Sequence, residues 1–170
     1  MAEKNNASNV TAAKPKIGGA IYMAPTGTEL PTDAETALNA AFVNLGFVSE
    51  DGLENANSAS SENTKEWGGS IVNTTLKEKE DKFKFTLIEA LNLHVLKLIY
   101  GENNVTGTLE TGITVKAKAE DYEEKSFVVD MVLKSGIIKR MVLPLAKVSE
   151  VGDVKYASGE NIGYETTLSA

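Results

Sequence analysis

The sequence predicts a mainly β, antiparallel fold with one flanking helix, and three observations lead to this expectation. Apolar and polar side chains alternate over residues 82–87, which read KFKFTL. Residues 126–134 and 137–143 are apolar on both faces and are separated by Ser-Gly as in a hairpin. Residues 89–100 instead repeat their leucines at helical spacing, and Gly101 follows where such a helix would end.

One domain with an N-terminal extension is expected from the length of 170 residues. Residues 1–16 are small, polar or charged, which predicts a flexible N-terminal arm, while residues 17–170 form the single β-domain. The start of the chain lacks the hydrophobic core of a signal peptide, so synthesis in the cytoplasm is expected. No apolar run approaches the roughly 20 residues of a membrane span, so no membrane contact is expected.

The stretch before Trp67 is the most polar part of the predicted domain. A strand over residues 41–49 is expected to turn at Asp51-Gly52, and residues 53–66 then contain almost no apolar side chain. This predicts a long loop that is either functional or mobile. Trp67, the only tryptophan, closes the loop, and both a core position and an interface anchor are open to it.

The segment after Trp67 predicts two strands and the helix. Residues 72–76 and 82–87 alternate as strands, and the charged sequence KEKEDK is expected to form the turn between them. The helix over residues 89–100 is apolar on two sides, so it needs two covers. One cover is its own sheet, and the other is a neighbouring subunit contacting the stripe of Leu93, Leu96 and Tyr100.

The C-terminal part of the chain predicts further strands. Residues 113–119, 147–156 and 161–168 show strand patterns, and the hairpin of residues 126–134 and 137–143 is apolar on both faces. That hairpin must therefore be covered twice or lie at the centre of the sheet.

The residues that enzymes and metal sites need are scarce. The chain has no cysteine and one histidine, His94, which lies at the edge of the predicted helix stripe and is expected to be a packing residue. No catalytic residue, cofactor site or metal site is therefore predicted. The balance of 17 basic against 24 acidic residues, a net charge of −7, argues against a surface that grips nucleic-acid phosphates.

A chain-long pattern of short sequences points to a family. Four sequence segments follow one another in order: KIGGAIYMAPTGTELPTDAETALNAAFVNLGFVSEDGLE, KEWGGSIV, KFKFTLIEALNLHVLKLIYG and NIGYETTLSA. Together they resemble the major tail tube protein of long, non-contractile-tailed bacteriophages over about residues 16–170. The resemblance implies a β-sandwich or half-barrel with one flanking helix. It also implies six-membered rings that stack into a tube around a tape-measure protein, capped by tail terminator and tip proteins, with genome DNA later passing through the lumen.

These implications define candidate assembly residues in the virion. Sheet edges left open in one subunit are expected to be covered by identical copies, and residues 53–66 and the N-terminal arm are candidates to order on ring stacking. Two acidic residues on polar strand faces are candidates to line the lumen, where negative charge keeps DNA off the wall. The stacking candidates are Asn55, Asn57, Glu62, Asn63, Lys65 and Trp67, joined by Leu93, Leu96 and Tyr100 of the helix; the lumen candidates are Asp130 and Glu165.

Two other classes of protein remain as alternatives. A monomeric β-sandwich module that binds carbohydrate or a protein ligand would need a cluster of exposed aromatic side chains, and aromatic residues make up only 6% of the chain. A β-barrel enzyme would need convergent titratable groups, which the sequence does not provide.

Overall fold

The computed structural model describes residues 4–170 and is mainly β with one α-helix, as predicted. Most strands join one sheet in the order β3-β2-β8-β9-β10-β5-β4, with β1 paired to β8, while β6 and β7 form a separate hairpin. The strands are β1 (Lys14–Pro15), β2 (Ile21–Pro25), β3 (Val43–Asn44), β4 (Val48–Lys65), β5 (Ile71–Leu87), β6 (Val105–Thr108), β7 (Gly112–Val115), β8 (Lys125–Val132), β9 (Ile138–Val151) and β10 (Tyr164–Ser169); the helices are α1 (Leu93–Tyr100) and the 3-10 turns Ala7–Asn9, Glu102–Asn104 and Lys134–Gly136.

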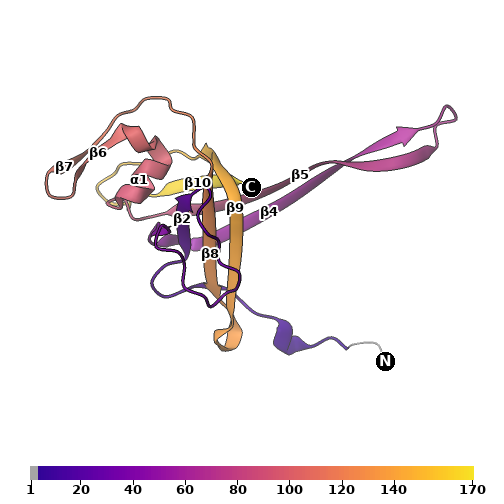
Figure 1. The fold of residues 1–170 in the computed structure, drawn as a ribbon, viewed down its shortest axis with the longest axis horizontal. Helices are drawn as coiled ribbons and strands as arrows, with labels where there is room; N and C mark the ends of the chain where they lie inside the picture. The colour runs from indigo at the N-terminus through magenta and orange to yellow at the C-terminus, as the bar shows by residue number, and fades with distance from the viewer. Residues whose placement is uncertain (1–3) are drawn as a thin grey trace.

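The long strand β9 divides this sheet into two halves. Its first part pairs with β8 as far as Ala146, and its last part, from Lys147 to Val151, pairs with β10. In Figure 1 the β2, β8 and β9 half runs across the direction of β10, β5 and β4. In orthogonal sheet packings, a bent strand that belongs to both halves connects the two strand directions, and β9 has this role here. The predicted hairpin of residues 126–134 and 137–143 is confirmed as β8 and β9.

The core lies between the two sheet halves and α1. Alternate residues of β5, Phe83, Phe85 and Leu87, face it, as the period of two predicted. The neighbouring strand β10, which pairs with β5, adds Tyr164 and Leu168, which are also buried. The other large contributors are Ile21, Leu45, Val95, Leu96, Leu98, Ile99, Phe127, Val129, Leu143 and Val148.

The second face of β8 is covered by the chain itself. Residues 126–130 are all buried, so both faces of the strand are inaccessible to water. Arg140 on β9 donates from Nη1 to the carbonyls of Asp33 (3.0 Å) and Thr36 (2.8 Å), which holds the segment between β2 and β3 over this face. The need for two covers is therefore met within one subunit.

The helix is shorter than the predicted range of residues 89–100. It begins at Leu93, because the Asn92 side chain caps it by accepting the backbone N–H of His94 at 3.0 Å. The preceding Glu89 is used elsewhere, since its carboxylate accepts the Phe47 N–H (3.0 Å) and the Asn92 amide (3.2 Å). The end at Gly101 is confirmed, with φ of 97° at that residue. His94 itself is exposed, so the prediction that it packs is wrong.

The predicted loop at residues 53–66 and the predicted KEKEDK turn are both wrong. Residues 53–65 belong to β4, and KEKEDK lies inside β5, so the two long strands form one hairpin whose turn is at residues 66–70. Polar composition did not prevent strand formation, because the ladder of backbone hydrogen bonds is independent of side chains. Asp51-Gly52 is likewise no hairpin turn and lies where the β4 register shifts, with φ of 73° at Gly52.

The described part of the N-terminal arm, residues 4–16, contacts the domain near its end. Lys14 and Pro15 pair with Val132 and Met131 of β8, and the Lys134 N–H donates to Thr11 Oγ1 at 2.8 Å. Residues 1–3 of the predicted arm lie outside the described residues. Within residues 4–170, no helix has both the length and the apolar character of a membrane span.

Candidate functional site

A long hairpin arm projects from the body of the molecule (Figure 1). We define the hairpin arm as residues 54–80, the outer parts of β4 and β5, and every one of these residues is exposed. A two-stranded ribbon with both faces in water is only marginally stable by itself. Within residues 4–170, no other segment covers either face of the arm.

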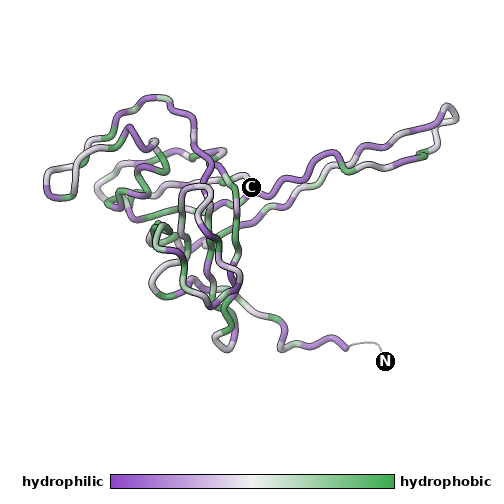
Figure 2. The backbone as a smooth tube through the Cα atoms, viewed as in Figure 1, coloured by the Kyte–Doolittle hydropathy of each residue, from purple (hydrophilic) through white to green (hydrophobic). Residues whose placement is uncertain are grey.

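The two faces of the hairpin arm differ in chemistry, as its register shows. Ser61 is opposite Leu76, Lys65 is opposite Ile71, and Ala59 is opposite Lys79, so these residues share the face that continues from the core. The intervening residues on both strands form the other face, which carries Glu62, Glu78 and Glu80. We call these the apolar-basic face and the acidic face. Figure 2 shows that the arm is largely hydrophilic, with short hydrophobic stretches toward its far end.

Six of the predicted stacking residues lie on this arm, and five of them are in the strand β4 instead of the predicted loop. Their side chains help to tie its two strands together: Asn57 donates to the Asp81 carboxylate at 2.6 Å, and Asn63 accepts from the Thr74 hydroxyl at 2.8 Å. Asn55 donates to the carbonyl of Lys82 at 3.2 Å. The five residues are Asn55, Asn57, Glu62, Asn63 and Lys65.

Trp67 stands in the turn at the tip of the arm and is fully exposed (103%). A core position for this tryptophan is therefore wrong, and the interface interpretation is the one that its location favours. Sequence reasoning missed the other apolar residues beside it, Ile71, Val72 and Leu76, which are 55–62% exposed. The signal that could have found them is the presence of three large apolar side chains in an otherwise polar segment, but the pattern predicted only a strand over residues 72–76.

The predicted contact stripe of α1 is only partly available to another subunit. Leu96 is buried in the core, so an intersubunit role for it is wrong, whereas Leu93 is half-buried. The Tyr100 ring packs edge-on against Tyr164 at 6.3 Å, and its hydroxyl lies 2.8 Å from that of Tyr156. Burial, followed by the neighbouring tyrosines, raises the pKa of Tyr100 and raises that of Tyr164 to about 12.

The two lumen candidates lie in opposite environments. Asp130 is buried and receives two hydrogen bonds from Arg140, so it does not face a bore and that prediction is wrong. Sequence alternation placed it on a polar face of β8, but this face is covered by the segment that Arg140 holds. Glu165 is half exposed on β10 and pairs with Lys84 of β5 at 3.0 Å.

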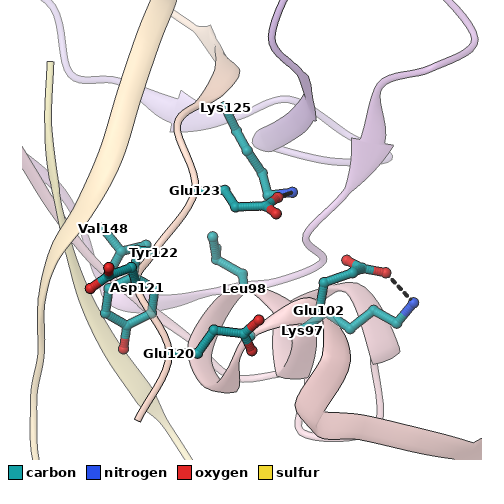
Figure 3. A pocket seen from close by; sticks show the side chains of 10 residues that line it. Lys97, Leu98, Glu102, Glu120, Asp121, Tyr122, Glu123, Lys125 and Val148 are labelled. Atoms are coloured by element: carbon teal, nitrogen blue, oxygen red, sulfur yellow. Dashed lines mark hydrogen bonds and ion pairs between the residues drawn. The ribbon is translucent and has the colours of Figure 1, made fainter.

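The pocket in Figure 3 lies between α1 and the segment before β8 and is lined by several carboxylates. Glu102 pairs with Lys97, and Glu123 pairs with Lys125 at 3.2 Å, so part of this charge is neutralised. In the part of the chain that the structure describes, no three histidine or carboxylate side chains are grouped to hold a metal ion. The exposed hairpin arm is the more unusual feature.

Comparison with known protein families identifies the family of this chain. The family described as "Phage tail tube protein" matches residues 1–170, which is the whole chain. A comparison with curated proteins gave no significant match. The family match agrees with the mainly antiparallel β-fold and the one α-helix of residues 4–170. This chain belongs to the phage tail tube protein family.

Proposed function

We propose that this chain is a structural, non-enzymatic subunit of the phage tail, which assembles into stacked hexameric rings and forms the conduit for DNA ejection. The observation that carries the proposal is the hairpin arm, residues 54–80, exposed throughout its length. Ordering these residues costs conformational entropy, and an exposed hairpin buries too little apolar surface to offset that cost unless a second surface covers it. In a tube every arm gains such a surface from an identical subunit.

The open ends of the sheet support ring closure. The sheet ends at β3 on one side and at β4 on the other, so each end strand has one edge that no strand of the described part of the chain pairs with. Unpaired edges are sites where another chain adds a strand. A head-to-tail contact between a β4 edge and the β3 side of a neighbour uses different surfaces on each subunit, and such contacts close into a ring when the rotation between subunits permits it. The ring number of six follows from the family resemblance.

The exposed face of the β9-β10-β5-β4 half supports a lumenal wall. The core side of these strands holds Phe83, Phe85 and Leu168, so the alternate residues face outward. This outer face carries carboxylates and lysines in contact, such as Glu165 with Lys84 and Glu80 with Lys82. Paired charges leave little free positive potential, which suits a wall along which DNA passes without specific binding.

The proposed setting follows from the same role. The subunit is synthesised in the cytoplasm of the host bacterium and resides in the tail of the virion. Its partners are identical subunits, the tape-measure protein inside the growing tube, and the terminator and tip proteins at its ends.

Removal of the outer arm tests the proposal. Ser58 and Glu80 are paired across the hairpin, so residues 59–79 can be replaced by Asn-Gly, which closes a two-residue hairpin turn. The variant should keep its core, because the deleted residues are all exposed. Negative-stain electron microscopy should show tubes for the full chain and none for the variant. Normal tubes from a folded variant would contradict the role of the arm.

A monomeric β-sandwich binding module remains the second proposal. It would elute as a monomer at every concentration in size-exclusion chromatography, whereas a tube subunit gives larger species as concentration rises. The exposed Trp67 is the only aromatic feature on the hairpin arm that would favour ligand binding.

A further inference from the structure

We propose that a groove at the end of the domain opposite the hairpin arm is the seat for the arm of a neighbouring subunit, which docks with its apolar-basic face. The inference rests on the proposed self-assembly and adds to it a receiving surface and an orientation. In Figure 1, α1 and the β6-β7 hairpin lie at one end of the molecule and the arm extends from the other.

The groove is formed by three segments that are far apart in sequence. The stretch leading into α1 supplies Ile88 and Leu91, the β6-β7 turn supplies Leu109, and the loop before β10 supplies Ile162. Leu91 and Leu109 are 69% and 62% exposed, which is unusual for leucines that line the same groove. Phe47 lies next to this groove, since its carbonyl accepts the Ile88 N–H at 3.1 Å, and it is also exposed.

The hairpin arm carries the other prominent set of exposed apolar residues. Ile71 and Leu76 lie on its apolar-basic face, and Trp67 stands at the tip. Because groove and arm are different surfaces at opposite ends, one subunit's arm can occupy the next subunit's groove while its own groove stays free. Such a heterologous contact repeats without limit, as a stacked tube requires.

Charge decides which face of the arm meets the groove. Glu89 and Glu160 line the groove. Glu160 pairs with Lys155 at 2.8 Å, whereas the two hydrogen bonds that the Glu89 carboxylate accepts come from uncharged donors, so Glu89 supplies the negative charge of the groove. The apolar-basic face of the arm presents Lys65 and Lys79 beside its apolar residues. The acidic face would instead bring further carboxylates against the groove, which is unfavourable.

Cysteine cross-linking tests this contact in the full-length chain, because the sequence contains no cysteine. A Leu76→Cys chain is mixed with a Leu91→Cys chain under oxidising conditions and analysed on a non-reducing gel. We expect a disulfide-linked dimer, since a disulfide requires Cα atoms within about 7 Å. Thr75→Cys is the matched control, because Thr75 is also exposed and lies on the acidic face. It should give little dimer with Leu91→Cys.

Assembly provides the second measurement. Leu76→Glu and Leu91→Glu should each raise the concentration at which tubes form by about tenfold or more, because burial of a leucine side chain is lost. Thr75→Glu and Ile137→Glu, at exposed sites outside the contact, should assemble like the unmodified chain. Tubes without the Leu76→Cys to Leu91→Cys cross-link would overturn the groove assignment alone. An unmodified chain that forms no tubes would contradict the proposed function itself.

Discussion

Arg140 and Asp130 face each other across β9 and β8 and form a buried, two-pronged ion pair. Arg140 Nε and Nη2 donate to the two carboxylate oxygens of Asp130 at 2.6 and 2.8 Å, and both side chains are almost inaccessible. Lys16, from the end of the N-terminal arm, adds a third charge at 3.3 Å. Arg140 is also the only arginine in the sequence. This pair joins the sheet, the segment before β3 and the N-terminal arm at one point.

Replacement of Asp130 should strongly destabilise the fold. Asp130→Asn leaves the Arg140 guanidinium buried without a counter-charge, which costs about 3–5 kcal/mol when one partner of a buried pair is removed. Urea denaturation followed by circular dichroism measures the free energy of unfolding. Glu165→Gln is the matched control, because its pair with Lys84 is exposed and should contribute little. Equal losses of unfolding free energy for the two substitutions would contradict the stabilising role of the buried Asp130–Arg140 pair.

The same carboxylate should make stability depend on acidic pH. Burial raises the pKa of Asp130, but hydrogen bonds and charges from Arg140 and then Lys16 outweigh it and hold the pKa below its usual value. A lowered pKa in the folded state stabilises the fold above the unfolded value of about 3.9, and this contribution is lost as pH falls through the folded value. The difference in unfolding free energy between the unmodified chain and Asp130→Asn should therefore be smaller at pH 3 than at pH 7. A constant difference between the two would refute this.

Tyr100 and Tyr164, whose rings pack edge-on, should ionise only at very alkaline pH. Burial raises the pKa of Tyr164 to about 12, and that of Tyr100 is raised as well. Between about pH 10 and pH 12 the unfolded chain loses these protons and the folded chain keeps them, so stability should fall over that interval. Absorbance titration should show a late step, and Tyr164→Phe should remove part of it. Ionisation of all tyrosines near pH 10 in the folded chain would contradict the prediction.

Gly46→Ala should be more damaging than Gly27→Ala, although both glycines have similar positive φ values of 80° and 84°. Each substitution costs about 1–2 kcal/mol for a left-handed backbone. At Gly46 the added methyl group also overlaps the carboxylate of Glu89, whereas at Gly27 it meets open space. Glu89 would have to move and lose the Phe47 N–H. Thermal unfolding of both variants provides the comparison, and equal losses would show that Glu89 adapts freely.

Charge reversal at Glu165 tests the proposed lumenal wall. Glu165→Lys removes the partner of Lys84 and leaves two cations together on the outer face of β10 and β5. If this face lines the bore, positive charge should retain phosphate groups and slow DNA release. Phage carrying the substitution should assemble normal tails yet eject DNA more slowly in a fluorescence release assay. Undiminished ejection would place Glu165 away from the lumen.

Hydrophobic periodicity and turn residues predicted most strands of the domain body. The alternation in β5 and β10 identified the buried faces, and the Ser-Gly pair located the β8-β9 hairpin. The helix was found but its start was not, because Glu89 is diverted to the Phe47 backbone and Asn92 takes over capping. Such local competition between side chains is not visible in hydrophobic periodicity.

The hairpin arm was missed as a structure because it has no buried face to create a pattern. Residues 53–65 lack apolar alternation, so composition favours a loop, yet the register with β5 organises them as a strand. The Asp130 prediction failed for the opposite reason. Alternation can assign a residue to the outer face of a strand, but it does not reveal that a distant segment, held by Arg140, covers that face.

The placement of arm and groove at opposite ends gives any tube built from these subunits a direction. With the proposed contact, the two ends of the tube are chemically unlike: one end presents hairpins that end in Trp67, and the other presents grooves lined by leucines. A factor that halts growth therefore needs to recognise only one extremity, and the initiating complex at the opposite extremity never competes with it.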